Sequence, residues 1–416
     1  MLLKLEELQH DARTCPRCSN CKWVDHIYMR SHRFAKICPI SARYSFNAYS
    51  APGLLDMALG LLENRLDYTP GLVDAVYHCL LCGACDVRCK RNLDIEVLGV
   101  LQALRFHCVS QGQGPPPPQR RLVGRVLRRG NRYGALPRRR WLPDGAIPKQ
   151  ADVLFFPGCN AAFAQQDLAR ATAAILESGG VGFAVMEPER CCGYPLFSLG
   201  VEGGLREIME ANLEARQHSG ASVLLTGCPH CYHTWKVTYP RLLEKSTEAL
   251  GFEVLHLSEF ALRLLERGAL KPRQGVAISL TYHDPCYLGR LGEPWAPWKG
   301  VRGEFGTLDP PKRFRRGNAG IYEAPREVLR RLGSPVTEME RVRENAWCCG
   351  AGGEVRAAFP DFAAWTARER LEEAKTTSAQ GLVTACPYCR ESLQGSPLPV
   401  LDLSQVLLQA LGRETV

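Results

Sequence analysis

The pattern of apolar and polar positions divides this 416-residue chain into two unlike halves. In the first, residues 1 to about 110, two stretches at 53–66 and 95–106 carry apolar residues at helical spacing. Cysteine-rich loops lie around these stretches, and the first eleven residues are charged and amphipathic, unlike a signal peptide. This half predicts a compact, mainly helical module whose loops present the cysteines.

From residue 151 onward the pattern changes to alternating strands and helices. Short, continuous apolar runs indicate buried strands at 153–156, 222–226, 276–282 and 382–385. Cysteines follow the carboxyl ends of these runs, and that edge is where open α/β sheets bind ligands. The expected fold class is therefore α+β and multidomain, with α/β architecture in this second half.

Residues 111–150 separate the two halves. Four consecutive prolines at 115–118 precede a segment, 120–140, that has nine arginines and no acidic residue. This composition predicts a linker. The arginines could also dock an acidic partner or a membrane surface.

An internal repeat organises the second half. Cysteine motifs of residues 157–159, 191–193 and 228–231 recur at 284–286, 348–350 and 386–389. Two related domains, 151–270 and 271–416, are the simplest explanation.

The cysteines of the first half form two sets of four. One set is Cys15, Cys18, Cys21 and Cys38, and the other is Cys79, Cys82, Cys85 and Cys89. Structural zinc is the alternative interpretation, but zinc ribbons use paired CxxC units, whereas these triple runs match two-cluster ferredoxins. In such ferredoxins the distal cysteine of each set serves the other cluster. We therefore expect two 4Fe-4S cubanes, one held by Cys15, Cys18, Cys21 and Cys89, the other by Cys79, Cys82, Cys85 and Cys38.

Five cysteines recur in each unit of the repeat, and two of them are adjacent. Adjacent cysteines can serve two irons of an opened cluster, and Gly193 or Gly350 would let the backbone approach closely. With these C, CCG and CxxC motifs, the chain resembles the heterodisulfide reductase family over essentially its whole length.

The resemblance implies one or two further 4Fe-4S clusters of the noncubane type at two sites. Their ligands would be Cys159, Cys191, Cys192, Cys228 and Cys231 at the first site, and Cys286, Cys348, Cys349, Cys386 and Cys389 at the second. The 61 residues between Cys286 and Cys348 imply an insertion around 291–322, and such insertions commonly serve as lids or docking surfaces.

Further side chains close to these cysteines could take part in chemistry. His230, His283, Asp284 and Tyr388 lie within three residues of the expected ligands, so each could donate a proton or hydrogen-bond to cluster sulfur. We regard His230 and His283 as weak catalytic candidates. The remaining cysteine, Cys108, is expected to be a small core residue.

Composition narrows the class of protein. The net charge of +9 includes no cofactor, and each cubane with four thiolates would add about −2. The sequence has no zinc-finger spacing, no apolar run of eighteen residues and no GxGxxG motif in a strand-to-helix setting. We therefore expect no nucleic-acid partner, no transmembrane segment, and no flavin or NAD on this chain.

These features predict an iron–sulfur electron-transfer subunit of a heterodisulfide reductase-like oxidoreductase complex. Electrons would pass through the two cubanes to the CCG clusters. The expected partner is a flavoprotein or a membrane cytochrome or quinone-linked subunit, and the expected location is cytoplasmic, with membrane association through that partner. The alternative is a catalytic thiol–disulfide reductase acting at a CCG cluster, since family relatives include both electron relays and the methanogen enzyme that cleaves a heterodisulfide.

Overall fold

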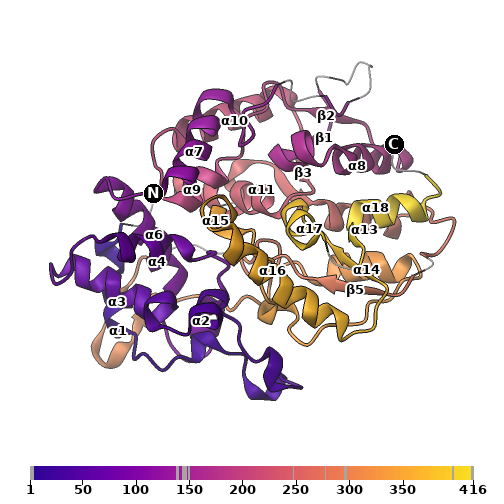
Figure 1. Ribbon diagram of the computed structural model, residues 1–416. Helices are drawn as coiled ribbons and strands as arrows, with labels where there is room; N and C mark the ends of the chain where they lie inside the picture. Colours follow the sequence, from indigo (N-terminus) through magenta and orange to yellow (C-terminus); the bar gives the residue numbers. More distant parts are fainter. Residues whose placement is uncertain are drawn as a thin grey trace.

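The computed structural model describes residues 4–136, 140–142, 148, 150–246, 248–276, 278–294, 298–395 and 398–413. A helical amino-terminal module lies beside two α/β units that contain the parallel sheets (Figure 1). This arrangement confirms the predicted fold class. Among the described residues, no helix is both long and apolar enough to cross a membrane.

The amino-terminal module is built from short helices around a central pair. Helices α3 and α6 pack against each other and against α1, and they correspond to the two stretches of helical spacing in the sequence. Pro52 stands in the first turn of α3, where a proline costs no hydrogen bond. The helices are α1 Gln9–Thr14, α2 Pro39–Tyr44, α3 Ala51–Leu62, α4 Pro70–His78, α5 Ala84–Cys89 and α6 Val97–Ser110.

The first α/β unit contains a four-stranded parallel sheet with the order β2-β1-β3-β4. Its central strands are apolar except for Thr226 because helices cover both faces. The strands are β1 Val153–Phe155, β2 Phe183–Val185, β3 Val223–Thr226 and β4 Glu253–His256, and the helices are α8 Gln166–Ser178, α9 Tyr194–Leu199, α10 Leu205–Ser219, α11 Pro229–His233, α12 Tyr239–Leu243 and α13 Leu257–Glu266.

The second unit repeats this plan with a shorter sheet, β5-β8-β9, which is also parallel. Val336 takes the place of the missing fourth strand through a single bridge to Leu280. The strand expected at 276–282 begins only at Leu280. The elements are β5 Leu280–His283, β8 Gly381–Thr384, β9 Val400–Asp402, α14 Glu323–Arg331, α15 Val355–Ala358, α16 Pro360–Lys375, α17 Pro387–Leu393 and α18 Leu403–Ala410.

The two units interlock through their last helices. Helix α18 of the second unit packs on α8 of the first, and α13 of the first packs on α14 of the second (Figure 1). Both last helices begin with a capping box, formed by His256 and Glu259 in α13 and by Asp402 and Gln405 in α18. The side chain of Gln405 also donates to Asp167 across the interface, at 3.0 Å. The internal repeat read from the sequence is therefore a repeat of structure.

The segment expected to be a linker contains a helix. Helix α7, Pro117–Arg129, packs against α9 and α15 and buries Leu122 and Val126, which lie four residues apart on one face. Gln119 donates to the backbone oxygen of Glu354 at 3.0 Å. This part of the segment therefore joins the module to both α/β units by packing. Residues 137–139, which include two of the nine arginines, lie outside the described residues.

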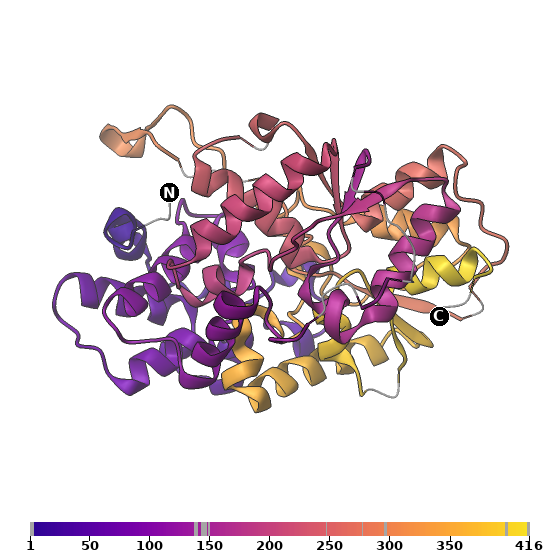
Figure 2. The same ribbon diagram turned by 90° about the horizontal axis from the view of Figure 1, so that it is seen from above.

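The segment expected as an insertion carries a small antiparallel hairpin, β6 Val301–Arg302 with β7 Leu308–Asp309. The hairpin projects beside the amino-terminal module (Figure 2). Lys312 pairs there with Asp94 and Glu96, at 2.5 and 3.0 Å, and Arg315 pairs with Asp86 at 3.0 Å. These ion pairs attach the insertion to the amino-terminal module.

Candidate metal centres

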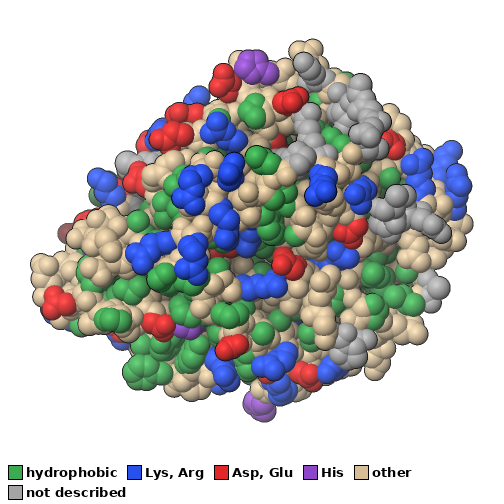
Figure 3. All heavy atoms as spheres, turned by 45° about the horizontal axis from the view of Figure 1, so that its top comes forward, with side chains coloured by type: hydrophobic (Ala, Val, Ile, Leu, Met, Phe, Trp, Pro, Cys, Tyr) green, Lys and Arg blue, Asp and Glu red, His purple; other side chains and the backbone are tan. Residues whose placement is uncertain are grey.

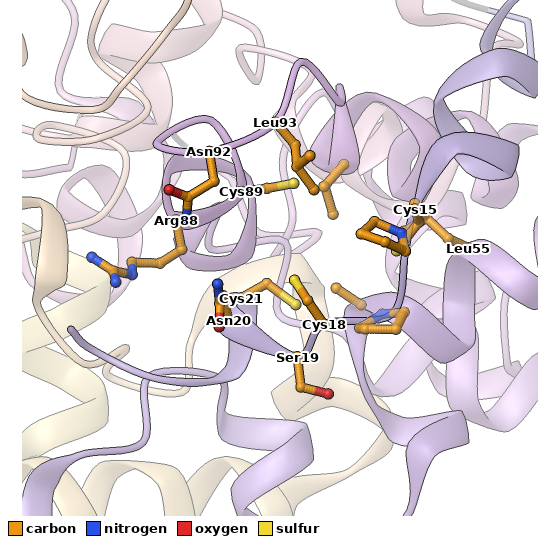
Figure 4. A pocket seen from close by; sticks show the side chains of 14 residues that line it. Cys15, Cys18, Ser19, Asn20, Cys21, Leu55, Arg88, Cys89, Asn92 and Leu93 are labelled. Atoms are coloured by element: carbon orange, nitrogen blue, oxygen red, sulfur yellow. The ribbon is translucent and has the colours of Figure 1, made fainter. Parts of the chain in front are cut away.

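The first site lies at the edge of the amino-terminal module. Cys15, Cys18, Cys21 and Cys89 line one pocket, in which the labelled cysteine side chains gather around a common space (Figure 4). Cys15 follows α1, Cys89 ends α5, and the loop between Cys15 and Cys21 is tight because Arg17 and Ser19 take left-handed conformations. Cys18 is exposed, whereas burial raises the pKa of Cys21 to about 12. The structure thus brings together the four cysteines that are expected when the distal cysteine of each set serves the other cluster.

The second site lies deeper in the same module. Cys38, Cys79, Cys82 and Cys85 are all buried, and burial and then the charges of Cys38 and Cys79 raise the pKa of Cys85 well above its usual value. The guanidinium of Arg105 donates to the backbone oxygen of Cys79 at 2.5 Å. These four cysteines are again the expected set, in which Cys38 comes from the other cysteine run.

The third site lies at the carboxyl edge of the first sheet. Cys159 follows β1, Cys191 and Cys192 follow β2, and Cys228 and Cys231 follow β3. The thiols of Cys191 and Cys231 donate to Cys192 and lower its pKa to about 5. Two further hydrogen bonds hold the adjacent pair: Asn212 donates to the oxygen of Cys191 at 3.0 Å, and the Tyr239 hydroxyl donates to that of Cys192 at 2.9 Å.

The fourth site repeats the third at the edge of the second sheet. Its five cysteines converge through direct thiol contacts, because Cys348 lies against Cys286 and Cys349, and Cys389 lies against Cys349 and Cys386. Hydrogen bonds from the thiols of Cys348 and Cys389 hold the pKa of Cys349 well below its usual value. All ten cysteines that the resemblance assigns are thus gathered into two groups of five.

A glycine follows the adjacent cysteines at each of these sites. Gly193 and Gly350 have φ values of +89° and +94°, in the left-handed region that favours glycine. A Cβ atom on Gly350 would lie 2.4 Å from the backbone oxygen of Ala363, and one on Gly193 would lie 2.8 Å from the side chain of Leu205. The expectation that these glycines permit close approach agrees with this geometry.

The two histidines singled out in the sequence occupy different surroundings. His283 lies at the fourth site, where its ring and the sulfurs of Cys349 and Cys389 are all within 4.8 Å of one another. Arg370 donates to Nδ1 of His283 at 3.0 Å, which fixes the ring. Because the ring is buried, its pKa is lowered, and the neutral imidazole is favoured.

His230 lies between the third and fourth sites. Its ring packs among Tyr194, Tyr287 and Tyr388, with centroids 4.2 to 4.5 Å apart. The hydroxyl of Tyr287 donates to the oxygen of Leu81 at 3.3 Å, in the loop of the second site. An aromatic cluster therefore joins three of the four sites, and spacing in the sequence did not reveal Tyr194 or Tyr287 as part of it.

The side chains of Asp284 and Cys108 are engaged in the fold itself. Asp284 forms an ion pair with Arg326 at 2.7 Å and accepts the backbone N–H of Arg343 at 2.9 Å, so its pKa is lowered despite burial. Cys108 is fully buried in the apolar core of the module. Neither offers a free group to a reaction.

A thiol contact connects the amino-terminal module to the fourth site. The thiol of Cys348 donates to Cys82 and lowers the pKa of Cys82 to about 6, with Arg290 adding to the effect. Cys21 of the first site is near enough to Cys38 and Cys85 of the second to raise the pKa of both. Together with burial, the charge of Cys228 at the third site likewise raises the pKa of Cys386 at the fourth. The groups therefore follow one another from exposed Cys18 through the second and fourth sites to the third.

The donor set fits iron–sulfur clusters. Thiolate sulfur is their usual ligand, and a bound metal displaces the protons that burial would otherwise hold on these thiols. Five converging sulfurs exceed the four ligands of a structural zinc ion. The residues present are therefore suited to hold such clusters.

Comparison with known proteins supports this assignment. Residues 11–93 match the family described as a 4Fe-4S dicluster domain, and residues 153–236 and 313–394 match the CCG cysteine-rich domain. The chain is 32% identical to a subunit of the dihydromethanophenazine:CoB–CoM heterodisulfide reductase of Methanosarcina mazei, over 97% of this chain and 94% of that protein.

Two more distant relatives share part of their length with the chain. The EtfAB:quinone oxidoreductase of Syntrophomonas wolfei is 26% identical over 84% of this chain and 48% of its own length. A subunit of the fumarate reductase (CoM/CoB) of Methanothermobacter marburgensis is 24% identical over 78% of this chain and 58% of its own length.

Proposed function

Because the chain belongs to the heterodisulfide reductase family, we propose that it is the iron–sulfur electron-transfer subunit of a related oxidoreductase complex. The contact between Cys82 and Cys348 carries this proposal, since it joins the ferredoxin-like module directly to a CCG site. With exposed Cys18 at the other end, the cysteine groups form an uninterrupted route between surface and interior.

Each group of cysteines has a proposed cofactor. The first and second sites hold 4Fe-4S cubanes through the four cysteines each gathers, and these cubanes supply one-electron transfer. The third and fourth sites hold noncubane 4Fe-4S clusters, because five sulfurs, two of them adjacent, exceed what one cubane with four irons requires. The protein's part is to place the sites next to one another and to keep water from the inner three.

The proposed partner is a second redox subunit that exchanges electrons at Cys18. The relatives named above include single subunits of a heterodisulfide reductase and of a fumarate reductase, together with a quinone oxidoreductase, which favours a hetero-oligomeric complex. A flavoprotein or a membrane cytochrome or quinone-linked subunit fits, and association with a membrane would then occur through that subunit.

The second candidate function is catalytic reduction of a disulfide at a CCG site. The observation that favours it is the cluster of His230 and three tyrosines between the third and fourth sites, where a substrate would meet both. Dithiols that change the EPR spectrum of the oxidised protein would support this function. A spectrum unchanged by dithiols would leave electron transfer as the only function.

Anaerobic purification of the protein with its partners from the native host tests the main proposal. We expect a brown complex with about four irons for each cluster, EPR signals of cubane type, and a copurifying redox subunit. The stoichiometry of iron decides whether one or both CCG sites are loaded. Zinc in place of iron, or a fully active isolated monomer, would contradict the proposal.

A further inference from the structure

Arg290 is a buried cation at the junction between the amino-terminal module and the second α/β unit. Its side chain is only 1% exposed. It donates to two backbone oxygens, those of Glu344 at 2.7 Å and Ala346 at 2.5 Å, while its Nε atom has no hydrogen-bonding partner in the described part of the chain. Within the described ranges no ion pair with a carboxylate is found for this guanidinium.

Four other buried arginines have such a partner, whereas Arg105, which is also 1% exposed, donates among the described residues only to backbone oxygens, one of them that of Cys79. Arg88 pairs with Asp25, Arg315 with Asp86, and both Arg341 and Arg370 with Glu373. Burying a charge without a counter-charge is costly, so a structure that keeps one normally supplies the opposite sign nearby. Arg290 therefore needs negative charge from a source other than a carboxylate.

The nearby negative charge is that of cysteine sulfur. Arg290 lies four positions after Cys286, and the oxygen of Ala346 to which it donates lies two positions before Cys348. Although burial opposes it, the charges of Cys82 and Cys286, and then those of Tyr322 and Cys348, raise the pKa of Arg290. Cys82 belongs to the second site, and Cys286 and Cys348 belong to the fourth. The guanidinium thus interacts with both groups of thiolates at the point where those groups touch.

The end of the insertion keeps Arg290 in this position. Gly317 has a φ of +78°, and a Cβ atom on it would lie 3.1 Å from Cβ of Arg290. Gly320 packs still closer, since a Cβ there would lie 1.9 Å from the backbone oxygen of Gly289. Tyr322 closes the loop by donating to the oxygen of Gly317 at 2.5 Å. The end of the insertion thus packs tightly against the backbone that carries Arg290.

We propose that Arg290 is a counter-cation shared by the second and fourth sites, which raises the reduction potentials of both. The inference rests on the proposed function. Reduction adds negative charge to a site, and a fixed cation in a buried, poorly screened environment stabilises the reduced form. Loss of the cation should therefore make reduction harder at both sites, and in the same direction.

EPR-monitored redox titration of the full-length protein tests this inference, comparing wild type, Arg290→Gln and Arg290→Lys. The control is Arg330→Gln, which removes an exposed arginine that pairs with Glu327 on α14. For Arg290→Gln we expect at least a tenfold loss in the reduction equilibrium at both sites, which is about 59 mV towards more negative potential for one electron. Arg290→Lys keeps the charge and should shift both potentials by less, and the control should shift neither.

Three results would overturn the inference: unchanged potentials in Arg290→Gln, a shift at only one site, or equal shifts in the Gln and Lys variants. If Arg290→Gln fails to retain iron, the iron content of Arg290→Lys shows whether the charge or only the side chain's size is needed. Retention at the wild-type level supports a need for charge, and equal loss in both variants refutes it. Absence of both signals from the wild type would instead overturn the proposed function itself, and the inference with it.

Discussion

The third and fourth sites have the same five-cysteine plan but differ in the charged groups beside them. At the third, Phe156 and Gly158 precede Cys159, and a Cβ on Gly158 would lie 2.7 Å from the sulfur of Cys231. The amide of Asn212 and the hydroxyl of Tyr239, both uncharged, donate to the backbone of the adjacent cysteines. At the fourth, His283 and Asp284 precede Cys286, and charged Arg290 lies alongside.

This difference follows from position in the molecule. The fourth site contacts the ferredoxin-like module through Cys82, so charged groups gather where the proposed electron path crosses between domains. Repeated cysteine motifs therefore do not imply equal reduction potentials, because potentials depend on nearby charge and hydrogen bonds to sulfur.

The largest effect is expected from Cys82→Ser, because it removes a proposed ligand and the contact with Cys348. The protein should lose about four irons and the EPR signal of the second site, and electrons supplied at the first should no longer reach the CCG sites. Iron analysis and stopped-flow absorbance measure this. Cys108→Ser, a buried thiol outside all four groups, is the matched control and should retain full iron.

The substitution His283→Phe tests the role of the histidine that lies three residues before Cys286. The corresponding residue before Cys159 at the third site is Phe156. Removing a fixed side chain next to metal ligands typically weakens metal binding about 10–100-fold, so iron should be released faster from the fourth site alone. The rate of iron transfer to a chelator, followed together with the EPR signals, measures this. His218→Gln, at an exposed histidine, should have no effect, and equal loss from the third site would contradict the contrast.

Alanine at the two CCG glycines should be unequally tolerated. In Gly350→Ala the new methyl group would meet backbone oxygen, which cannot move, whereas in Gly193→Ala it would meet the flexible side chain of Leu205. Gly350→Ala should cost about 1–3 kcal/mol of unfolding free energy and Gly193→Ala less, although both carry backbone strain. Anaerobic denaturant unfolding checks the order, and a larger cost at Gly193 would refute this explanation.

The smallest effects are expected at the two helix caps, with opposite dependence on pH. Burial lowers the pKa of His256 to about 4, so stability rises with pH up to about 6.5, where the unfolded histidine loses its proton. Burial raises the pKa of Asp402 to about 6, above its unfolded value, so stability falls as pH rises from about 4 through 6.

Between pH 5.5 and 7.5, each cap should contribute about 1 kcal/mol to the change in unfolding free energy. Asn at either position keeps a capping side chain and removes the titration. Relative to wild type, Asp402→Asn should therefore gain stability as pH rises across this range, and His256→Asn should lose it. Denaturant midpoints at the two pH values measure this, and parallel changes in both variants would contradict it.

The arginine-rich segment shows what composition alone leaves undecided. Basic side chains gather on the face that carries α7 (Figure 3), and the exposed arginines of this helix agree with a solvated surface. Yet Leu122 and Val126 anchor the same segment to the α/β units, because two apolar residues four apart suffice to fix a helix against a packed surface. A role for this face in docking stays a prediction.

The sequence alone determined the four cysteine groups, the internal repeat and the family, because thiolate ligands must recur at spacings that short loops allow. Strand ends could be located from apolar runs, since buried parallel strands contain few polar residues. The strands β2, β4 and β9 were not anticipated, and β4 and β9 each include a charged residue, Glu253 and Asp402, which shortens the apolar run.

Only the tertiary structure shows which of the four cysteine groups lie next to one another. Cys82 and Cys348 are 266 positions apart in the chain, and Arg290 meets sulfurs from two domains because the insertion holds it there. Such contacts depend on how separately formed elements pack, and no local pattern encodes them. The exposure of Cys18, the uncharged hydrogen-bond donors at the third site and the charge beside the fourth all follow from that packing.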